Sequence, residues 1–329
     1  MTPLVGHAEQ VLELREAATG GRLHHAWLLA GPRGIGKGLF ARLAARWLLA
    51  DAALPIAGAP GFAVPEDHPT ARLIAAGSHP DYKLLERLPR DTGNELARNI
   101  SIAQVRALQP ILGSTPSQSF RRVILIDAID DLERGAANAL LKNLEEPPAN
   151  TIFFLISHAP GRLLPTIRSR CRVLRFQPLT PVETDRAIRA QLPDAGNGEV
   201  DALVALSDGS PGMALRFAGL DIAGLDAALA RLAGAGDPAN AERSALSRAL
   251  ATKAAQPRFE AFLERAPAFI AALAAKRSGV ELARALAAWE AARSLAASAQ
   301  PLALDPQAVA FELGTLVAGL APGASSAKG

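Results

Sequence analysis

The chain has 329 residues, of which 49% are hydrophobic and 20% charged, and its formal net charge is +3 at pH 7. This length allows two or three domains, and the small net charge excludes a long polycationic tail as the main feature. A single cysteine, Cys171, excludes an internal disulfide and a zinc site built from cysteines. The start of the chain has no secretory pattern, and no apolar run reaches the ~18 residues that a membrane span needs. We therefore expect a cytoplasmic globular protein without a membrane partner.

Three short apolar runs in the first half of the chain predict buried strands. They cover Ala26–Ala30, Val123–Ile126 and Ile152–Ile156, and helical patterns lie between them. Continuous apolar strands that alternate with helices are typical of a parallel sheet covered on both faces. The spacing of apolar residues over Ser101–Leu112 predicts one of these helices. The fold class is therefore α/β over this part of the chain.

A glycine-rich segment follows the first predicted strand and opens a helix over Lys37–Ala50. Its sequence is Gly31-Pro32-Arg33-Gly34-Ile35-Gly36-Lys37-Gly38, in the strand-to-helix setting that a phosphate-binding P-loop requires. Glycines at 31, 34 and 36 let backbone N–H groups turn inward around a phosphate, and the helix N-terminus favours negative charge. Lys37 is placed to reach the terminal phosphates. The segment predicts a site for ATP or ADP phosphates.

This predicted nucleotide site departs from that of a hydrolysing enzyme. Gly38 stands where a Ser or Thr hydroxyl binds magnesium. Asp127 ends the second apolar run, where a carboxylate holds magnesium, but Ala128 follows it instead of a glutamate that orients water. Ser157 ends the third run and has two open interpretations, a contact to the terminal phosphate or water, and a strand-end cap. We therefore expect at most weak nucleotide binding without hydrolysis.

The composition changes after Phe176, where strand-like runs stop and helical patterns continue to the end. Thr180–Gln191 is predicted to be a helix, and Ser207–Gly212 is a break rich in Gly, Pro and Ser. Beyond it the chain is rich in Ala and Leu with helical periodicity. The predicted parts are an α/β P-loop domain (1–178), a small helical lid (179–219), an all-helical domain (220–322) and a disordered tail (323–329).

Several segments resemble the AAA+ clamp-loader family of bacterial DNA polymerase III. His25–Leu29 leads into the P-loop as it does in that family, and Asn138–Pro148 resembles its Leu-Leu-Lys-x-Leu-Glu-Glu-Pro-Pro motif. Ser169-Arg170-Cys171 matches its Ser-Arg-Cys signature. The resemblance covers roughly the first two thirds of the chain. It implies a AAA+ P-loop domain with a helical lid, and a C-terminal helical domain that joins a ring-shaped collar.

Within that family the chain is similar to the non-hydrolysing delta-prime branch. Hydrolysing gamma/tau subunits keep Ser or Thr after the P-loop lysine and Glu after the strand-end aspartate. The arginine of the family's lid pattern is replaced here by Gly212, with Arg216 as a second candidate one turn later. His79-Pro80-Asp81-Tyr82 resembles a stretch that follows a four-cysteine zinc module in the branch, but those cysteines are absent here. We predict no zinc, with His68 and His79 as ordinary loop residues.

The resemblance implies a role for Arg170 as an arginine finger that acts on the ATP site of a neighbouring gamma/tau subunit, with Ser169 orienting the turn. A surface ion pair is the simpler alternative for Arg170. The implied partners are gamma/tau and delta subunits in a ring, and through them the sliding clamp and primed DNA. The chain would then be a component of a DNA-directed DNA polymerase holoenzyme, a nucleotidyltransferase complex, with no ATPase activity of its own.

Two other functions remain open from the sequence. A hydrolysing gamma/tau-like motor would turn over ATP without partners, and the residues at 38 and 128 argue against it. A small-molecule kinase built on the same P-loop would not explain the motifs at 138–148 and 169–171, and it would have no affinity for gamma/tau.

Overall fold

The computed structural model describes residues 2–56, 58–89 and 96–322. The chain divides into two compact units. The first is Met1–Ala190 with Asp208–Gly212, and the second is Gln191–Ser207 with Met213–Gly329. The expected domain boundaries at 178 and 219 stay predictions, and the expected tail at 323–329 lies outside the described residues.

The first unit contains a parallel five-stranded sheet in the order β2-β3-β4-β1-β5. The central strands are buried on both faces, as their uninterrupted apolar sequences predict. The α/β fold class is therefore confirmed for this unit. The strands are β1 Ala26–Ala30, β2 Tyr82–Glu86, β3 Arg122–Asp127, β4 Thr151–Ser157 and β5 Arg172–Arg175.

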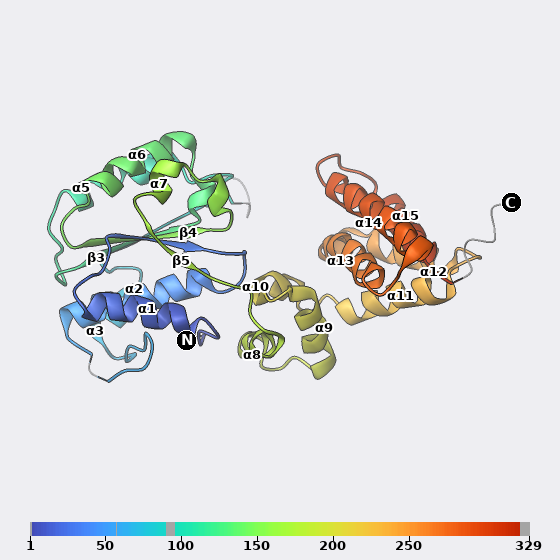
Figure 1. The fold of residues 1–329 in the computed structure, drawn as a ribbon, viewed down its shortest axis with the longest axis horizontal. Helices are drawn as coiled ribbons and strands as arrows, with labels where there is room; N and C mark the ends of the chain where they lie inside the picture. The colour runs from blue at the N-terminus through green and yellow to red at the C-terminus, as the bar shows by residue number, and fades with distance from the viewer. Residues whose placement is uncertain (1, 57, 90–95, 323–329) are drawn as a thin grey trace. The chain divides into compact units, whose positions relative to one another are not determined.

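Helices cover both faces of this sheet (Figure 1). Alternate residues of β1 divide between two apolar cores: Trp27 and Leu29 pack with α1 to α3, and Ala26 and Leu28 pack on the side of α4 to α7. These side chains are fully buried. The helices on the sheet are α1 Ala8–Thr19, α2 Lys37–Ala53, α3 Pro69–Ala75, α4 Ile102–Arg106, α5 Gln109–Leu112, α6 Arg134–Glu145 and α7 Pro165–Arg168, and α8 Pro181–Gln191 follows β5.

Two details of this unit differ from expectation. Strands β2 and β5 were not predicted, because they lie at the sheet edges and carry exposed charged residues in place of an apolar run. The single helix expected over Ser101–Leu112 is two short helices, α4 and α5, and Pro110 sits in the first turn of the second. Proline lacks the N–H that would continue the preceding helix, so the chain restarts there.

The second unit is helical throughout its regular structure. Buried Phe262 and Ile270 of α13 and Leu313 of α15 belong to its core. Helix α14 packs along α13, and α12 packs along α15. Within residues 2–56, 58–89 and 96–322, none of the helices combines the length and apolar character needed to cross a membrane. The helices are α9 Asn197–Ser207, α10 Pro211–Ala214, α11 Ile222–Ala235, α12 Ala241–Leu250, α13 Gln256–Ala274, α14 Gly279–Ala299 and α15 Pro306–Ala318.

Candidate functional site

The predicted phosphate residues meet at the carboxyl edge of the sheet. Ser157 is the register partner of Ala30, and the Gly31 N–H donates to the Ser157 carbonyl at 3.3 Å. Asp127 ends the neighbouring strand β3, opposite Ile156. Ligands of open parallel sheets bind at this edge, beside the strand where the order reverses. The P-loop, Asp127 and Ser157 are therefore brought together as the sequence predicted.

The P-loop glycines are required by the backbone. Gly34 and Gly36 have φ angles of 82° and 103°, a region that side-chain-bearing residues rarely adopt. A Cβ at Gly31 would lie 2.4 Å from the Phe176 carbonyl oxygen. The loop is further held by His7, whose Nε2 lies 2.7 Å from the Ile35 carbonyl oxygen. The strand-to-helix geometry of a phosphate loop is thus present.

Lys37 begins α2 and is almost completely buried, with 2% of its surface exposed. Its ammonium group donates to the Gly31 carbonyl at 2.7 Å and to the Pro32 carbonyl. Burial lowers the pKa of Lys37 to about 8, and the nearby carboxylates of Asp127 and Asp130 only partly oppose that shift. An ammonium group that binds its own loop must exchange these carbonyls for a phosphate.

Because the pKa of Lys37 is lowered in the folded state, the free energy of unfolding should change with pH in the alkaline range. Lys37 releases its proton near pH 8 when folded and near its ordinary 10.5 when unfolded, so the unfolded state holds more protons between these values. The free energy of unfolding should therefore rise with pH across this window, relative to a Lys37→Met variant. Urea unfolding of both proteins at pH 7.5 and pH 10 measures this difference. A difference that does not change with pH would contradict the burial argument.

The residues around the expected magnesium position differ from those of a hydrolysing P-loop. A Cβ added at Gly38 would lie 3.0 Å from Oδ2 of Asp127. That oxygen lies 3.8 Å from the Arg42 guanidinium, which also donates to Glu86 at 3.3 Å. Burial raises the pKa of Asp127, although Arg42 acts in the opposite direction. The residues present fit a phosphate but do not fit magnesium, which needs a hydroxyl at 38 and an unpaired carboxylate at 127.

Ser157 bonds to a carboxylate of its own chain, and its predicted contact to a terminal phosphate or water stays a prediction. Its hydroxyl donates to Asp130 at 2.9 Å, and Asp130 also accepts the backbone N–H groups of His158 and Ala159. Asp130 therefore caps the end of β4. Burial and the Lys37 charge lower the pKa of His158 to about 4, so its ring is neutral at pH 7. The Ser157 hydroxyl is committed to the protein itself.

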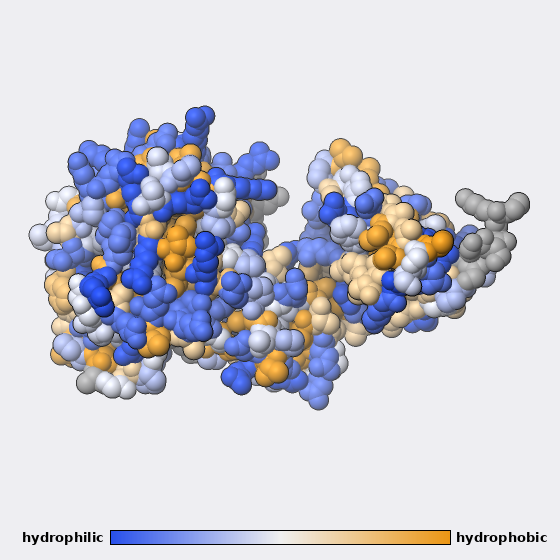
Figure 2. Space-filling model, in the orientation of Figure 1, coloured by the Kyte–Doolittle hydropathy of each residue, from blue (hydrophilic) through white to orange (hydrophobic). Residues whose placement is uncertain are grey.

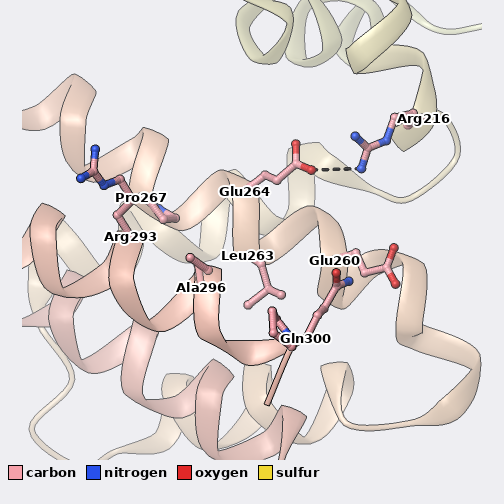
Figure 3. Close-up of a pocket in the computed structure, with 10 residues that line it drawn as sticks. Arg216, Glu260, Leu263, Glu264, Pro267, Arg293, Ala296 and Gln300 are labelled. Carbon is pink, nitrogen blue, oxygen red and sulfur yellow. Dashed lines mark hydrogen bonds and ion pairs between the residues drawn. The ribbon is translucent and has the colours of Figure 1, made fainter. Parts of the chain in front are cut away.

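The lid position Gly212 contacts the P-loop directly. Its N–H donates to the Gly34 carbonyl at 2.9 Å, and a Cβ at 212 would lie 3.0 Å from that carbonyl oxygen and 3.1 Å from the Gly34 Cα. The alternative, Arg216, belongs to the second unit, where its guanidinium pairs with Glu264 at 3.0 Å. That pair borders a groove of about 540 Å³ lined by α13 and α14 residues (Figure 3).

Restoring an arginine at the lid should fail for steric reasons. We expect Gly212→Arg to lower the stability of the chain by about 1–3 kcal/mol, because its Cβ has to displace the Gly34 backbone. Nucleotide affinity should not rise. Thermal unfolding and fluorescent ATP binding measure the two effects. Gly161→Arg is the matched control, since a Cβ there meets nothing within 4 Å. Equal stability of both variants would refute this interpretation.

Arg170 lies in the turn between α7 and β5. Its Nη1 donates to the Thr166 carbonyl at 2.9 Å, and its Nη2 lies 2.9 Å from Oε1 of Glu145. The Ser169 hydroxyl donates to the same carbonyl at 3.2 Å, so both polar residues of the signature stabilise this turn. Cys171 is partly buried, and burial raises the pKa of its thiol to about 12. Arg170 is 34% exposed in its side chain, so it is held in place yet accessible.

The parallel sheet, the P-loop after β1, the aspartate after β3 and the polar end of β4 define a AAA+ module. A sequence model of the family described as "DNA polymerase III, delta subunit" matches residues 6–180, more than half of the chain. The chain belongs to this family. It is 41% identical over 203 residues to "DNA polymerase III subunit delta'" of Pseudomonas aeruginosa, and 38% identical over 160 residues to the protein of that name from Bacillus subtilis. The predicted resemblance to the delta-prime branch is confirmed.

The similarity is limited to part of each protein. It covers 61% and 49% of this chain, and 58% and 44% of these two relatives. A subunit named gamma/tau from Mycobacterium bovis is 34% identical over 201 residues, which cover 61% of this chain and 32% of that protein. The chain thus spans about half the length of the delta-prime relatives that it matches.

Three residues of the site were not predicted from the sequence: Arg42, Asp130 and Glu145. Arg42 lies one helical turn after Gly38, so the helical spacing could have predicted that both residues lie on the same face of α2. Asp130 bonds residues 27 to 29 positions away, and no local pattern indicates that contact. Glu145 is part of a recognised motif, but its pairing with Arg170 depends on how α6 and α7 pack.

Among the described residues no group of three or more His, Cys, Asp or Glu side chains is arranged to hold a metal ion. His68 caps α3 by accepting the Thr70 N–H, and His79 accepts the Asp81 N–H in the same way. Both histidines thus have structural roles in their loops.

Proposed function

We propose that this chain is a non-hydrolysing subunit of a DNA polymerase III clamp loader, and that it supplies Arg170 to the ATP site of a neighbouring gamma/tau subunit. The observation that carries this proposal is the Ser-Arg-Cys turn, where Arg170 is ordered by three acceptors and remains accessible. A guanidinium group can contact phosphate oxygens bidentately and stabilise the charge that develops in phosphoryl transfer.

The chain's own P-loop is proposed to be inactive in hydrolysis. Three features support this: Gly38 and Arg42 at the magnesium position, Ala128 in place of a water-orienting carboxylate, and Gly212 against the loop. Weak binding of ATP or ADP through Lys37 is compatible with the proposal. A hydrolysing gamma/tau-like motor is the second candidate, since gamma/tau relatives also match the chain. The same three features argue against it.

The C-terminal helical part is proposed to join a ring-shaped collar with gamma/tau and delta subunits. Figure 2 shows apolar residues on the visible surface of this helical part, which contains α14 and α15. Two large apolar side chains of α14, Val280 and Leu286, are 86% and 45% exposed. Exposed apolar surface of this kind marks protein–protein interfaces. The ring would brace the loader while it places a sliding clamp on primed DNA, at the replisome in the cytoplasm.

The test is a loader reconstituted from gamma/tau, delta and this chain, with ATP hydrolysis measured in the presence of primed DNA and the clamp. Gel filtration establishes assembly in parallel. The purified chain alone should hydrolyse no ATP, and the complex with Arg170→Ala should assemble and hydrolyse less than the native complex. If the native chain does not join the complex, the proposal fails. Hydrolysis by the chain alone would favour the second candidate.

A further inference from the structure

Glu145 is the last residue of α6, and Glu146 follows it at the C-cap. The C-terminus of a helix carries partial negative charge from its carbonyl groups, so carboxylates there are locally unfavourable. No such placement is needed to end the helix, since the two prolines at 147 and 148 already do so. A residue that breaks a local preference in this way is expected to have a function elsewhere.

The partner of Glu145 is the guanidinium group of Arg170, 2.9 Å away. The other acceptors of that group, the Thr166 carbonyl and the Ser169 hydroxyl, belong to the same turn as Arg170. Glu145 therefore links the guanidinium to a different element. That element is rigid, because Leu140 and Leu144 of α6 are fully buried against the sheet.

We propose that Glu145 is a positioning residue for the arginine finger. This inference rests on the proposed function of Arg170. Glu145 holds the long side chain in one orientation before the neighbouring ATP site is engaged, so that less conformational freedom is lost when the guanidinium contacts phosphate. The pair is half exposed, with 49% of the Glu145 side chain accessible, so an exchange of its carboxylate for phosphate costs little.

The experiment uses the reconstituted loader with primed DNA and the clamp. Four forms of this chain are compared: native, Glu145→Ala, Arg170→Ala and the double variant. We expect Glu145→Ala to lower kcat at the ATP site that this chain serves, measured by single turnover, roughly threefold to tenfold, with KM for ATP unchanged; this is the effect of no longer ordering one side chain. Glu145→Gln keeps an acceptor at the same place and should recover part of the loss. Glu146→Ala, the adjacent exposed carboxylate, is the matched control and should leave kcat unchanged.

The double variant separates positioning from a merely structural role. If Glu145 acts through Arg170, its removal has no further effect once Arg170 is alanine. The inference is wrong if kcat is unchanged or higher in Glu145→Ala, or if Glu145→Ala lowers kcat equally in both backgrounds. If Arg170→Ala itself has no effect, the proposed function fails instead. Gel filtration of each complex ensures that every comparison is made on assembled loaders.

Discussion

Replacement of Arg170 by alanine is expected to lower ATP hydrolysis at the neighbouring site about 10³-fold, the lower end of what an arginine finger contributes. On the proposed function the guanidinium group stabilises charge that develops in the transition state, so kcat should fall while KM for ATP changes little. The total turnover of the loader should fall by the fraction that the site next to this chain contributes. A single-turnover measurement with limiting ATP gives that share directly.

Two further variants make the Arg170 result specific. Arg170→Lys keeps the charge but loses the planar fork, so it should restore only a small part of the turnover. Arg168→Ala removes a neighbouring exposed arginine, which contacts the Pro160 carbonyl at 3.5 Å, and should have no effect on turnover. Equal losses from Arg168→Ala and Arg170→Ala in assembled complexes would mean that general positive charge, rather than a finger, is responsible.

Removal of the Asp81 carboxylate is expected to cost about 3–5 kcal/mol of stability, the range for breaking a buried charged pair. Asp81 is 1% exposed and accepts the N–H groups of Ser117 and Gln118, at distances from 2.7 to 3.0 Å. Its partner Arg122 is also buried, 3.7 Å away. In Asp81→Ala these donors and one positive charge are left inside the protein without their acceptor. Urea unfolding followed by tryptophan fluorescence measures the loss, since Trp27 and Trp47 lie in the same unit.

The Asp81 prediction has its own controls. Asp81→Asn retains an acceptor oxygen of similar size and should lose less stability than the alanine variant. The double variant Asp81→Ala, Arg122→Met removes both charges and should be more stable than Asp81→Ala alone. A loss below about 0.5 kcal/mol in Asp81→Ala, within the range of ordinary surface changes, would show that the carboxylate does not stabilise the fold.

The local features of the nucleotide site could be predicted from the sequence. Glycines at 31, 34 and 36 are needed by the backbone itself, and the strands before and beside the loop are continuous apolar runs. The departures from the motif at Gly38 and Ala128 can be recognised without a structure. Each of these positions normally carries a side chain with one function, a hydroxyl that binds magnesium or a carboxylate that orients water. Strands β2 and β5 could not be found in this way, since edge strands lack the apolar run that identified the others.

The sequence by itself determined the α/β class, the phosphate loop and the Ser-Arg-Cys turn, because each depends on residues close together in the chain. Only the tertiary structure decided which distant residues contact the phosphate loop and the Ser-Arg-Cys turn. It placed Arg42 between Glu86 and Asp127, joined Asp130 to the end of β4, set Gly212 against Gly34, and paired Glu145 with Arg170. These contacts link separate elements, and side-chain chemistry alone does not specify which of many compatible charges will meet. The packing of helices on the sheet makes that choice.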